Sequence, residues 1–229
     1  MFKSRVRDII FPQYEHGRLA GTVARAWGNE AFERPALDFD AFVAGVTLHD
    51  WGYGTIDNLP IGAAPEKEWL EVIRKNVEKR YDHPTTDIIV KLHLRRLLSM
   101  FPSAAREALI AQVDERIDGR LLESEAPFEK YRRADKITRL CDMISFAFCF
   151  ESPSQLTYEV FPQQGSDQMT DITFEIRPSG EIIVTPWPFS VPIISGVTYA
   201  FEAQGYPDTL NPLVVPFKII QIGSIFNTS

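Results

Sequence analysis

Four histidines and a few aspartates are the side chains of this sequence best suited to hold a metal ion. The histidines are His16, His49, His83 and His93. His49 is followed directly by Asp50, so one helical turn offers an imidazole nitrogen and a carboxylate oxygen. This donor pair suits divalent transition ions such as Zn, Mn or Fe better than calcium. The pattern therefore indicates a metal site centred on His49-Asp50.

Two later aspartates, Asp135 and Asp142, are candidates for a further carboxylate ligand. They are seven positions apart on one predicted helix, so both can share a face. Asp142 follows Cys141 in an apolar segment, where an ionised carboxylate is costly unless a cation or hydrogen bonds compensate it. Asp135 lies among basic side chains, which favours a surface ion pair. We therefore expect Asp142 to be the ligand, with Asp135 as the alternative.

Apolar spacing and prolines predict the helices that carry these residues. A stripe over 13–27 places His16 on the apolar face, and a second helix over 38–50 begins at Asp38, a good N-cap. Prolines suited to a first helical turn predict further helices. These span 65–80, 84–100, 102–117 and 126–150. The histidines and aspartates are thus predicted to lie on or beside successive helices.

The composition changes near residue 152. Residues 152–229 hold nine of the sixteen prolines and only two basic residues. Alternation over 172–176, a turn at Ser179-Gly180 and an apolar run over 182–184 predict a β-hairpin. A strand is also predicted over 213–222, where Pro216 would confine it to a sheet edge or a bulge.

Helices followed by strands predict an α+β protein that is mainly α. We expect a helical metal-site domain over 1–151 and a small proline-rich β segment over 152–229 packed on the helical body.

The net charge, the cysteines and the hydropathy of the sequence limit the possible partners and cellular compartment. The net charge of −7, from 24 basic and 31 acidic residues, argues against a nucleic-acid partner. Cys141 and Cys149 are eight positions apart on a predicted helix, about 12 Å, too far for a disulfide. No signal peptide or membrane span is evident. We expect a cytoplasmic protein with free thiols and no membrane partner.

The wider sequence resembles a known superfamily through its ligand order and three stretches. The order is His, then His-Asp, then Asp on successive helices. The stretches are Gln13–His16 with Leu19-Ala20 and Ala26–Gly28, then His49–Tyr53, then Pro186–Phe189. Together they resemble the HD-domain superfamily of metal-dependent phosphohydrolases, in particular a prokaryotic branch that is a domain of unknown function. The resemblance implies an HD-domain-like helical bundle.

The resemblance also implies a ligand set. His16, His49, Asp50 and Asp142 correspond to the basic metal set of the superfamily. Binuclear members have additional histidines between the His-Asp pair and the last aspartate. His93 is the better match for such a ligand, and His83, just before a proline, is the weaker one. One or two divalent transition ions are expected, with Fe, Mn, Zn, Co and Ni all open.

The function expected from this resemblance is metal-dependent hydrolysis of a nucleotide or another small phosphorylated compound. Asp50 would bridge two ions or orient water, and His93 would bind a second ion or act as general acid. Two alternatives stay open. One is a di-iron oxygenase of the HD type, which would use all four histidines with Asp50 and one late aspartate. The other is a non-catalytic regulatory module that binds a metal or ligand. A homo-oligomer is compatible with the sequence.

Overall fold

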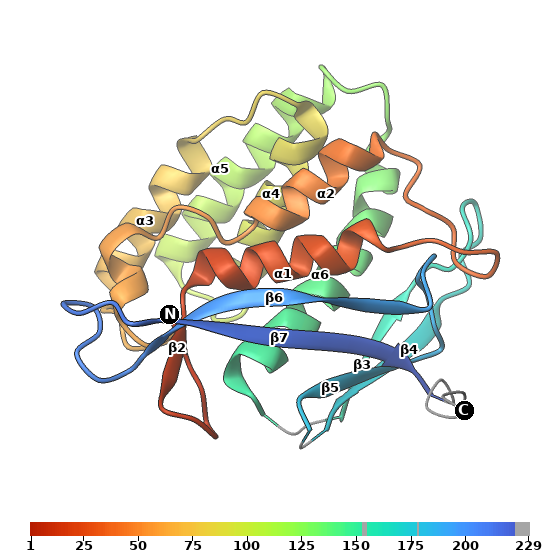
Figure 1. Cartoon of the computed structure of the whole chain (residues 1–229). Helices are drawn as coiled ribbons and strands as arrows, with labels where there is room; N and C mark the ends of the chain where they lie inside the picture. Colours follow the sequence, from red (N-terminus) through yellow and green to blue (C-terminus); the bar gives the residue numbers. More distant parts are fainter. Residues whose placement is uncertain (153–154, 178, 223–229) are drawn as a thin grey trace, which may run out of the picture.

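The structure, a computed structural model, describes residues 1–152, 155–177 and 179–222 (Figure 1). Within these residues six α-helices come before most of a large β-sheet. The helices are α1 (Gln13–Arg25), α2 (Phe39–Leu48), α3 (Glu66–Glu78), α4 (Pro84–Ser99), α5 (Ala104–Leu121) and α6 (Phe128–Phe150), with a 3₁₀ helix η1 (Gly54–Asn58). The six predicted helices are therefore confirmed, with ends that shift by a few residues.

The residues at the helix starts explain why these segments were predictable. The Asp38 side chain accepts a hydrogen bond from the Ala41 backbone N–H and so caps α2. Ser103 caps α5 in the same way through the N–H of Arg106. Pro84 occupies the first turn of α4, where its missing N–H leaves no hydrogen bond unmade.

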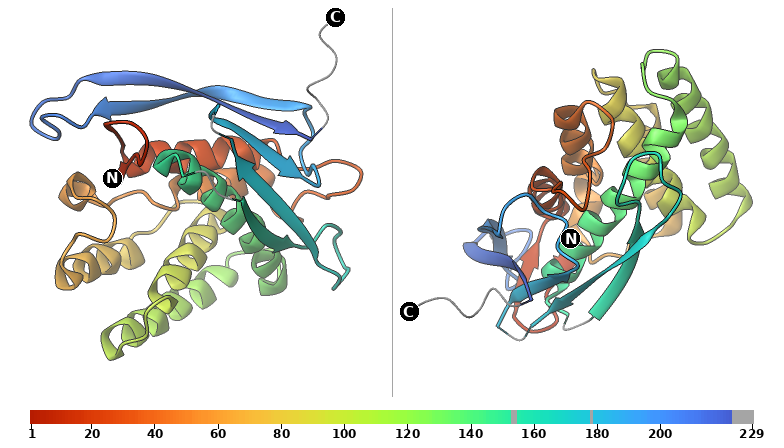
Figure 2. Two further views of the ribbon diagram at one scale, coloured as in Figure 1. Left: turned by 90° about the horizontal axis from the view of Figure 1, so that it is seen from below. Right: turned by 90° about the vertical axis from the view of Figure 1, so that its right-hand side faces the viewer.

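The sheet of the described residues has seven strands in the order β1-β2-β6-β7-β5-β4-β3. The strands are β1 (Phe2–Lys3), β2 (Ile9–Phe11), β3 (Gln155–Val160), β4 (Thr170–Ile176), β5 (Glu181–Thr185), β6 (Ile193–Glu202) and β7 (Pro212–Gln221). Strands β5 and β7 are parallel, and the other neighbours are antiparallel. The sheet curls along one side of the helices (Figure 2).

The expectation of a mainly α protein with a small C-terminal β segment is wrong. The chain is α+β, with a large mixed sheet as a second major component. Two of its strands, β1 and β2, come from the N-terminus, and β2 pairs with β6 almost two hundred residues later. Such short strands carry little local pattern, because their stability comes from a distant partner.

The predicted hairpin is present. The last strand is also present, but its predicted position at a sheet edge is wrong. Strands β4 and β5 pair with Ile176 opposite Ile182, as the alternation indicates. The last strand, β7, lies inside the sheet between β6 and β5, not at an edge. Pro216 is tolerated there because β5 pairs with β7 only from Lys218 onward. At Pro216 itself, among the residues that the structure describes, one side of β7 has no paired strand.

Helices α1 and α6 form the layer between the sheet and the remaining helices (Figures 1 and 2). The Phe148 ring of α6 makes edge contacts with Phe11 of β2 and Phe217 of β7, at centroid distances of 5.9 and 6.1 Å. Burying a ring of this size is worth roughly 1.5–3 kcal/mol. These contacts fix α6, which carries Asp142, against the sheet.

Two further features concern the cysteines and the length of the helices. Both cysteines, Cys141 and Cys149, are buried and free. Among the residues placed in the structure, no helix is both long and apolar enough to span a membrane.

Candidate metal centre

The structure gathers five of the predicted site residues into one buried cluster, here called the His/Asp cluster. Its members are His16 from α1, His49 and Asp50 from the end of α2, His93 from α4 and Asp142 from α6. All five are at most 9% exposed. Buried charges require a partner or a cation, so a cluster with two aspartates and three histidines has the composition of a metal site.

Four donor atoms of the His/Asp cluster face one another. His16 Nε2 lies 3.0 Å from His49 Nε2, 3.1 Å from Asp142 Oδ1 and 3.6 Å from Asp50 Oδ2. His49 Nε2 lies 3.4 Å from Asp142 Oδ1 and 3.9 Å from Asp50 Oδ2. Ligands about 2.0–2.2 Å from a tetrahedral ion are about 3.3–3.6 Å apart. These five separations bracket that range, and the donor atoms of His16, His49 and Asp142 lie close enough together to hold a divalent ion.

Hydrogen bonds at the far side of each ring fix the tautomers of His16 and His49. His49 Nδ1 lies 2.6 Å from the Val46 carbonyl oxygen, which can only accept, so Nδ1 carries a proton. The Ser145 hydroxyl donates to the His16 carbonyl at 2.7 Å, so His16 Nδ1 donates to Ser145 Oγ at 2.9 Å. The neutral rings therefore turn two Nε2 lone pairs toward each other. That arrangement requires a shared proton or a metal ion, and histidines that bind metals are oriented in this way.

His93 has a different role in the geometry of the cluster. Arg96 Nη2, which can only donate, lies 2.9 Å from His93 Nδ1. The neutral ring therefore carries its proton on Nε2 and donates it to Asp50 Oδ1 at 3.0 Å. The Tyr53 hydroxyl donates to the same oxygen at 3.1 Å. These two bonds hold Asp50 so that its other oxygen, Oδ2, faces the Nε2 atoms of His16 and His49.

The electrostatics of the cluster favour bound cations. Burial opposes ionisation of Asp50 and Asp142, but the neighbouring histidines outweigh it and hold the pKa of both carboxyls below their usual range. Burial also disfavours the His49 imidazolium, yet Asp142 and then Asp50 raise the pKa of His49 to about 8. Burial and the charge of His49 lower the pKa of His93. Without a metal, a proton on His49 takes the place of the cation.

Glycines bring the helices close enough for the cluster to form. A Cβ at Gly17 would lie 2.5 Å from the Thr47 carbonyl oxygen, and one at Gly21 would lie 1.9 Å from Thr47 Oγ1. These contacts are too short for any side chain, so α1 and α2 can pack at this distance only with glycine. Gly45 plays the same role between α2 and Ile89 of α4. The spacing of His16 and His49 thus depends on residues that take no part in the chemistry.

His83 and Asp135 lie outside the His/Asp cluster. His83 precedes α4, where its Nδ1 accepts a hydrogen bond from the Thr85 N–H, and its side chain is 47% exposed. Asp135 forms an ion pair with Arg96, and its side chain is 22% exposed. We predicted from the sequence that Asp135 pairs with a basic residue of its own helix. Its partner, Arg96, instead lies on α4.

Sequence reasoning missed three residues that contact the cluster. Arg96 donates to His93, Ser145 fixes His16 and Tyr53 holds Asp50. Arg96 and Ser145 each lie three positions after a cluster residue on the same helix, His93 and Asp142 respectively. This spacing places side chains on neighbouring positions of one helix face, so it is the signal that could have identified them.

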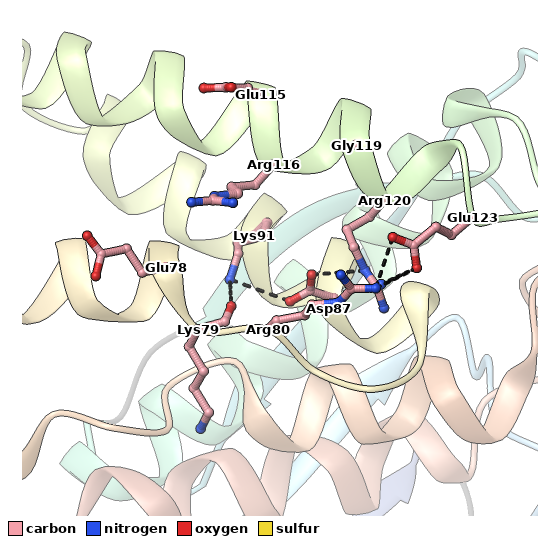
Figure 3. A pocket seen from close by; sticks show the side chains of 10 residues that line it. All are labelled: Glu78, Lys79, Arg80, Asp87, Lys91, Glu115, Arg116, Gly119, Arg120 and Glu123. Carbon is pink, nitrogen blue, oxygen red and sulfur yellow. Dashed lines mark hydrogen bonds and ion pairs between the residues drawn. The ribbon is translucent and has the colours of Figure 1, made fainter.

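A second group of buried charges lies between α3, α4 and α5, around a pocket of about 340 Å³ (Figure 3). Asp87 stands between Lys91 Nζ at 3.5 Å and Arg120 Nε at 3.2 Å. Lys91 also donates to the carbonyls of Asn76 and Lys79 at the end of α3, at 2.8 and 2.6 Å. These contacts tie the end of α3 to α4, and we interpret the group as structural.

The metal-free protein is expected to lose stability as pH rises from 6.5 to 8.5. The pKa of His49 in the folded state, about 8, lies above the ordinary value of 6.5. Its contribution is therefore complete below pH 6.5 and is lost as pH rises through 8. The full shift corresponds to about 2 kcal/mol, of which about 1.5 kcal/mol is lost between pH 6.5 and 8.5 because His49 of the unfolded chain is already half deprotonated at pH 6.5. Urea denaturation of chelator-treated protein at both pH values measures it.

Asp142→Asn is the control, because it removes the charge that most raises the pKa of His49. Its free energy of unfolding should depend much less on pH in this range. The lowered pKa values of Asp50 and Asp142 place their titrations far below the range. A wild-type stability that stayed level or increased between pH 6.5 and 8.5 would contradict this assignment.

Comparison with known proteins gives one family. The family described as "Protein of unknown function (DUF3891)" matches residues 3–199. No curated protein matches the chain. No solved structure matches it either.

The expected membership of the HD-domain superfamily is wrong. The matching family is DUF3891, and the fold combines helices with a curled seven-stranded sheet instead of an HD-like helical bundle. The His-Asp motif misled because a short ligand pattern can occur in unrelated folds. The metal-site hypothesis now depends on the geometry of the His/Asp cluster alone.

Proposed function

The chain belongs to the DUF3891 family, and from the cluster that it carries we propose that it is a metal-dependent phosphohydrolase acting on a small phosphorylated compound. The observation that carries the proposal is the pair of Nε2 atoms of His16 and His49, which face each other at 3.0 Å beside two ionised carboxylates. The Nδ1 atoms of both rings donate hydrogen bonds, so the Nε2 lone pairs of both rings are free to bind an ion.

His16, His49, Asp50 and Asp142 would hold the ion. Two imidazole nitrogens and two carboxylates suit Zn, Mn, Fe, Co or Ni, and the sequence does not choose among them. When bound, such an ion polarises a phosphoryl oxygen and lowers the pKa of water. A second group, formed by His49, Asp50 and His93, also has donor atoms close enough for a metal. We favour the first group because His93 Nε2 carries a proton in the observed hydrogen-bond network.

Asp50 and His93 would be the proton-handling pair. Asp50 Oδ1 accepts the Nε2 proton of His93, while Asp50 Oδ2 faces the ligand nitrogens. In this arrangement the neutral His93 ring orients the carboxylate, and its protonated form would act as general acid. Arg96, whose guanidinium contacts both His93 and Asp142, places a permanent positive charge next to the centre. Arginine next to a metal is suited to bind phosphoryl oxygens.

Hydrolysis of phosphate monoesters tests the proposal. Chelator-treated protein should be inactive toward 4-nitrophenyl phosphate and nucleoside monophosphates, and one of Mn, Fe, Co, Ni or Zn should restore activity. His49→Ala should lower kcat/KM by roughly a hundredfold or more, because it removes a ligand from the centre of the site. His83→Asn is the matched control. It replaces an exposed histidine outside the cluster by another good N-cap, so activity should be unchanged.

Full metal occupancy without turnover of any phosphate ester would contradict the proposed reaction and favour the regulatory-module alternative. The di-iron oxygenase alternative needs all four histidines at one centre. His83 is half-exposed at the start of α4 and does not join the His/Asp cluster, so the ligand set of that alternative is incomplete.

A further inference from the structure

A pocket of about 620 Å³ lies between α4, α5 and the start of α6. Its apolar wall is made by Leu92, Ile117, Leu121 and Phe128. Leu92 and Ile117 are buried, whereas the Phe128 ring is 43% exposed at the rim. A volume of this size is typical of a small-molecule site, and a half-exposed ring offers a face on which a flat ligand can stack.

This pocket shares a wall with the His/Asp cluster. Arg96 and Asp135 both line the pocket and form an ion pair with each other. The same Arg96 guanidinium reaches His93 Nδ1 at 2.9 Å and Asp142 Oδ2 at 3.5 Å. One side chain therefore touches the cluster on one side and the pocket on the other. A ligand in the pocket that carries an anionic group can place that group on Arg96, next to the cluster.

The charges of the lining select the kind of ligand. Three arginines, Arg95, Arg96 and Arg132, are balanced by three aspartates, Asp114, Asp118 and Asp135. Arg95 is paired with Asp114, and Arg132 is paired with Glu129 outside the pocket. The lining is thus close to neutral and does not favour a polyphosphate. It fits an uncharged organic group beside one anion.

From this juxtaposition we infer that the α4–α5–α6 pocket binds the organic part of a phosphate monoester, an aryl- or nucleobase-sized group. Its phosphoryl group contacts Arg96. The inference rests on the proposed function, since it identifies the substrate class of the same site. Leu92, Ile117, Leu121 and Phe128 bury the flat group, and Arg96 binds the anion that both sites share.

Two phosphonates, whose C–P bond resists hydrolysis, test the inference. Benzylphosphonate carries an aryl group, and methylphosphonate carries the anion alone. In calorimetric titrations of the manganese-loaded full chain, benzylphosphonate should bind at least about tenfold more tightly. Phe128→Ala should remove most of that preference. Phe101→Ala should keep it, because Phe101 is a 65% exposed ring that does not line the pocket.

Arg96→Gln should weaken both phosphonates by a similar factor, because both carry the anion. Equal affinity of the wild type for the two phosphonates, or an undiminished preference in Phe128→Ala, would overturn the inference. Ester hydrolysis that continued in that case would leave the proposed function in place. Conversely, a Phe128-dependent preference in a protein that hydrolyses no ester would support the pocket while contradicting the reaction.

Discussion

The Asp142→Asn variant is expected to bind divalent transition metal at least about tenfold more weakly than the wild type. Asp142 Oδ1 lies 3.1 Å from His16 Nε2 and 3.4 Å from His49 Nε2, so it faces the same point as both lone pairs. The amide keeps the size of the side chain but removes its charge. Metal titrations of chelator-treated protein, followed by competition with a fluorescent indicator, measure the change.

Asp135→Asn is the matched control, an identical substitution two turns earlier on α6. Asp135 contacts Arg96 at a partly exposed position and is not close to the facing Nε2 atoms. Its substitution should change metal affinity by less than about threefold, in line with the small worth of such pairs. A larger loss from Asp135→Asn than from Asp142→Asn would show that Asp135, and not Asp142, is the metal ligand on α6.

Asp87→Asn is expected to lower the free energy of unfolding by roughly 3–5 kcal/mol. Asp87 is 2% exposed and lies between two buried cations, Lys91 and Arg120 (Figure 3). Burial already lowers the pKa of Lys91, and Asp87 offsets this effect. Without the carboxylate, Lys91 would remain buried without a counter-charge, and Arg120 would keep only its ion pair with Glu123. Urea denaturation at neutral pH measures the loss.

Asp114→Asn is the control for this experiment. Asp114 pairs with Arg95 at 2.7 Å, but both side chains are more than 40% exposed. An exposed pair of this kind contributes at most about 1 kcal/mol. If both substitutions had the same small effect, the Asp87 group would not hold α3 against α4 as we suggest.

The helices could be predicted from the sequence because their signals are local. Asp38 and Ser103 cap their helices through backbone groups three residues away. The sheet could not be predicted in the same way. Strand β6 carries apolar residues on both faces, including the exposed Val197 and Tyr199, so it lacks the alternation that marks a strand. Its neighbours, β2 and β7, lie on opposite sides of it in the sheet and come from opposite ends of the chain.

The residues of the site could be predicted from their types, but their geometry could not. A buried aspartate such as Asp142 and an adjacent pair such as His49-Asp50 are recognisable in any sequence. The 3.0 Å approach of His16 and His49 depends on Gly17 and Gly21, whose role appears only when α1 and α2 are seen in contact. The superfamily resemblance, drawn from the ligand order and three short stretches, therefore implied a fold that the chain does not have.

Anomalous diffraction from crystals of the metal-loaded protein is the most direct test of the central claim. Data collected at the absorption edge of the bound metal should give a peak bonded to His16 Nε2, His49 Nε2 and carboxylate oxygens of Asp50 and Asp142. His16 Nδ1 and His49 Nδ1 should keep their hydrogen bonds to Ser145 and Val46. A metal bound elsewhere, or no peak while the two Nε2 atoms remain in direct contact, would contradict the account.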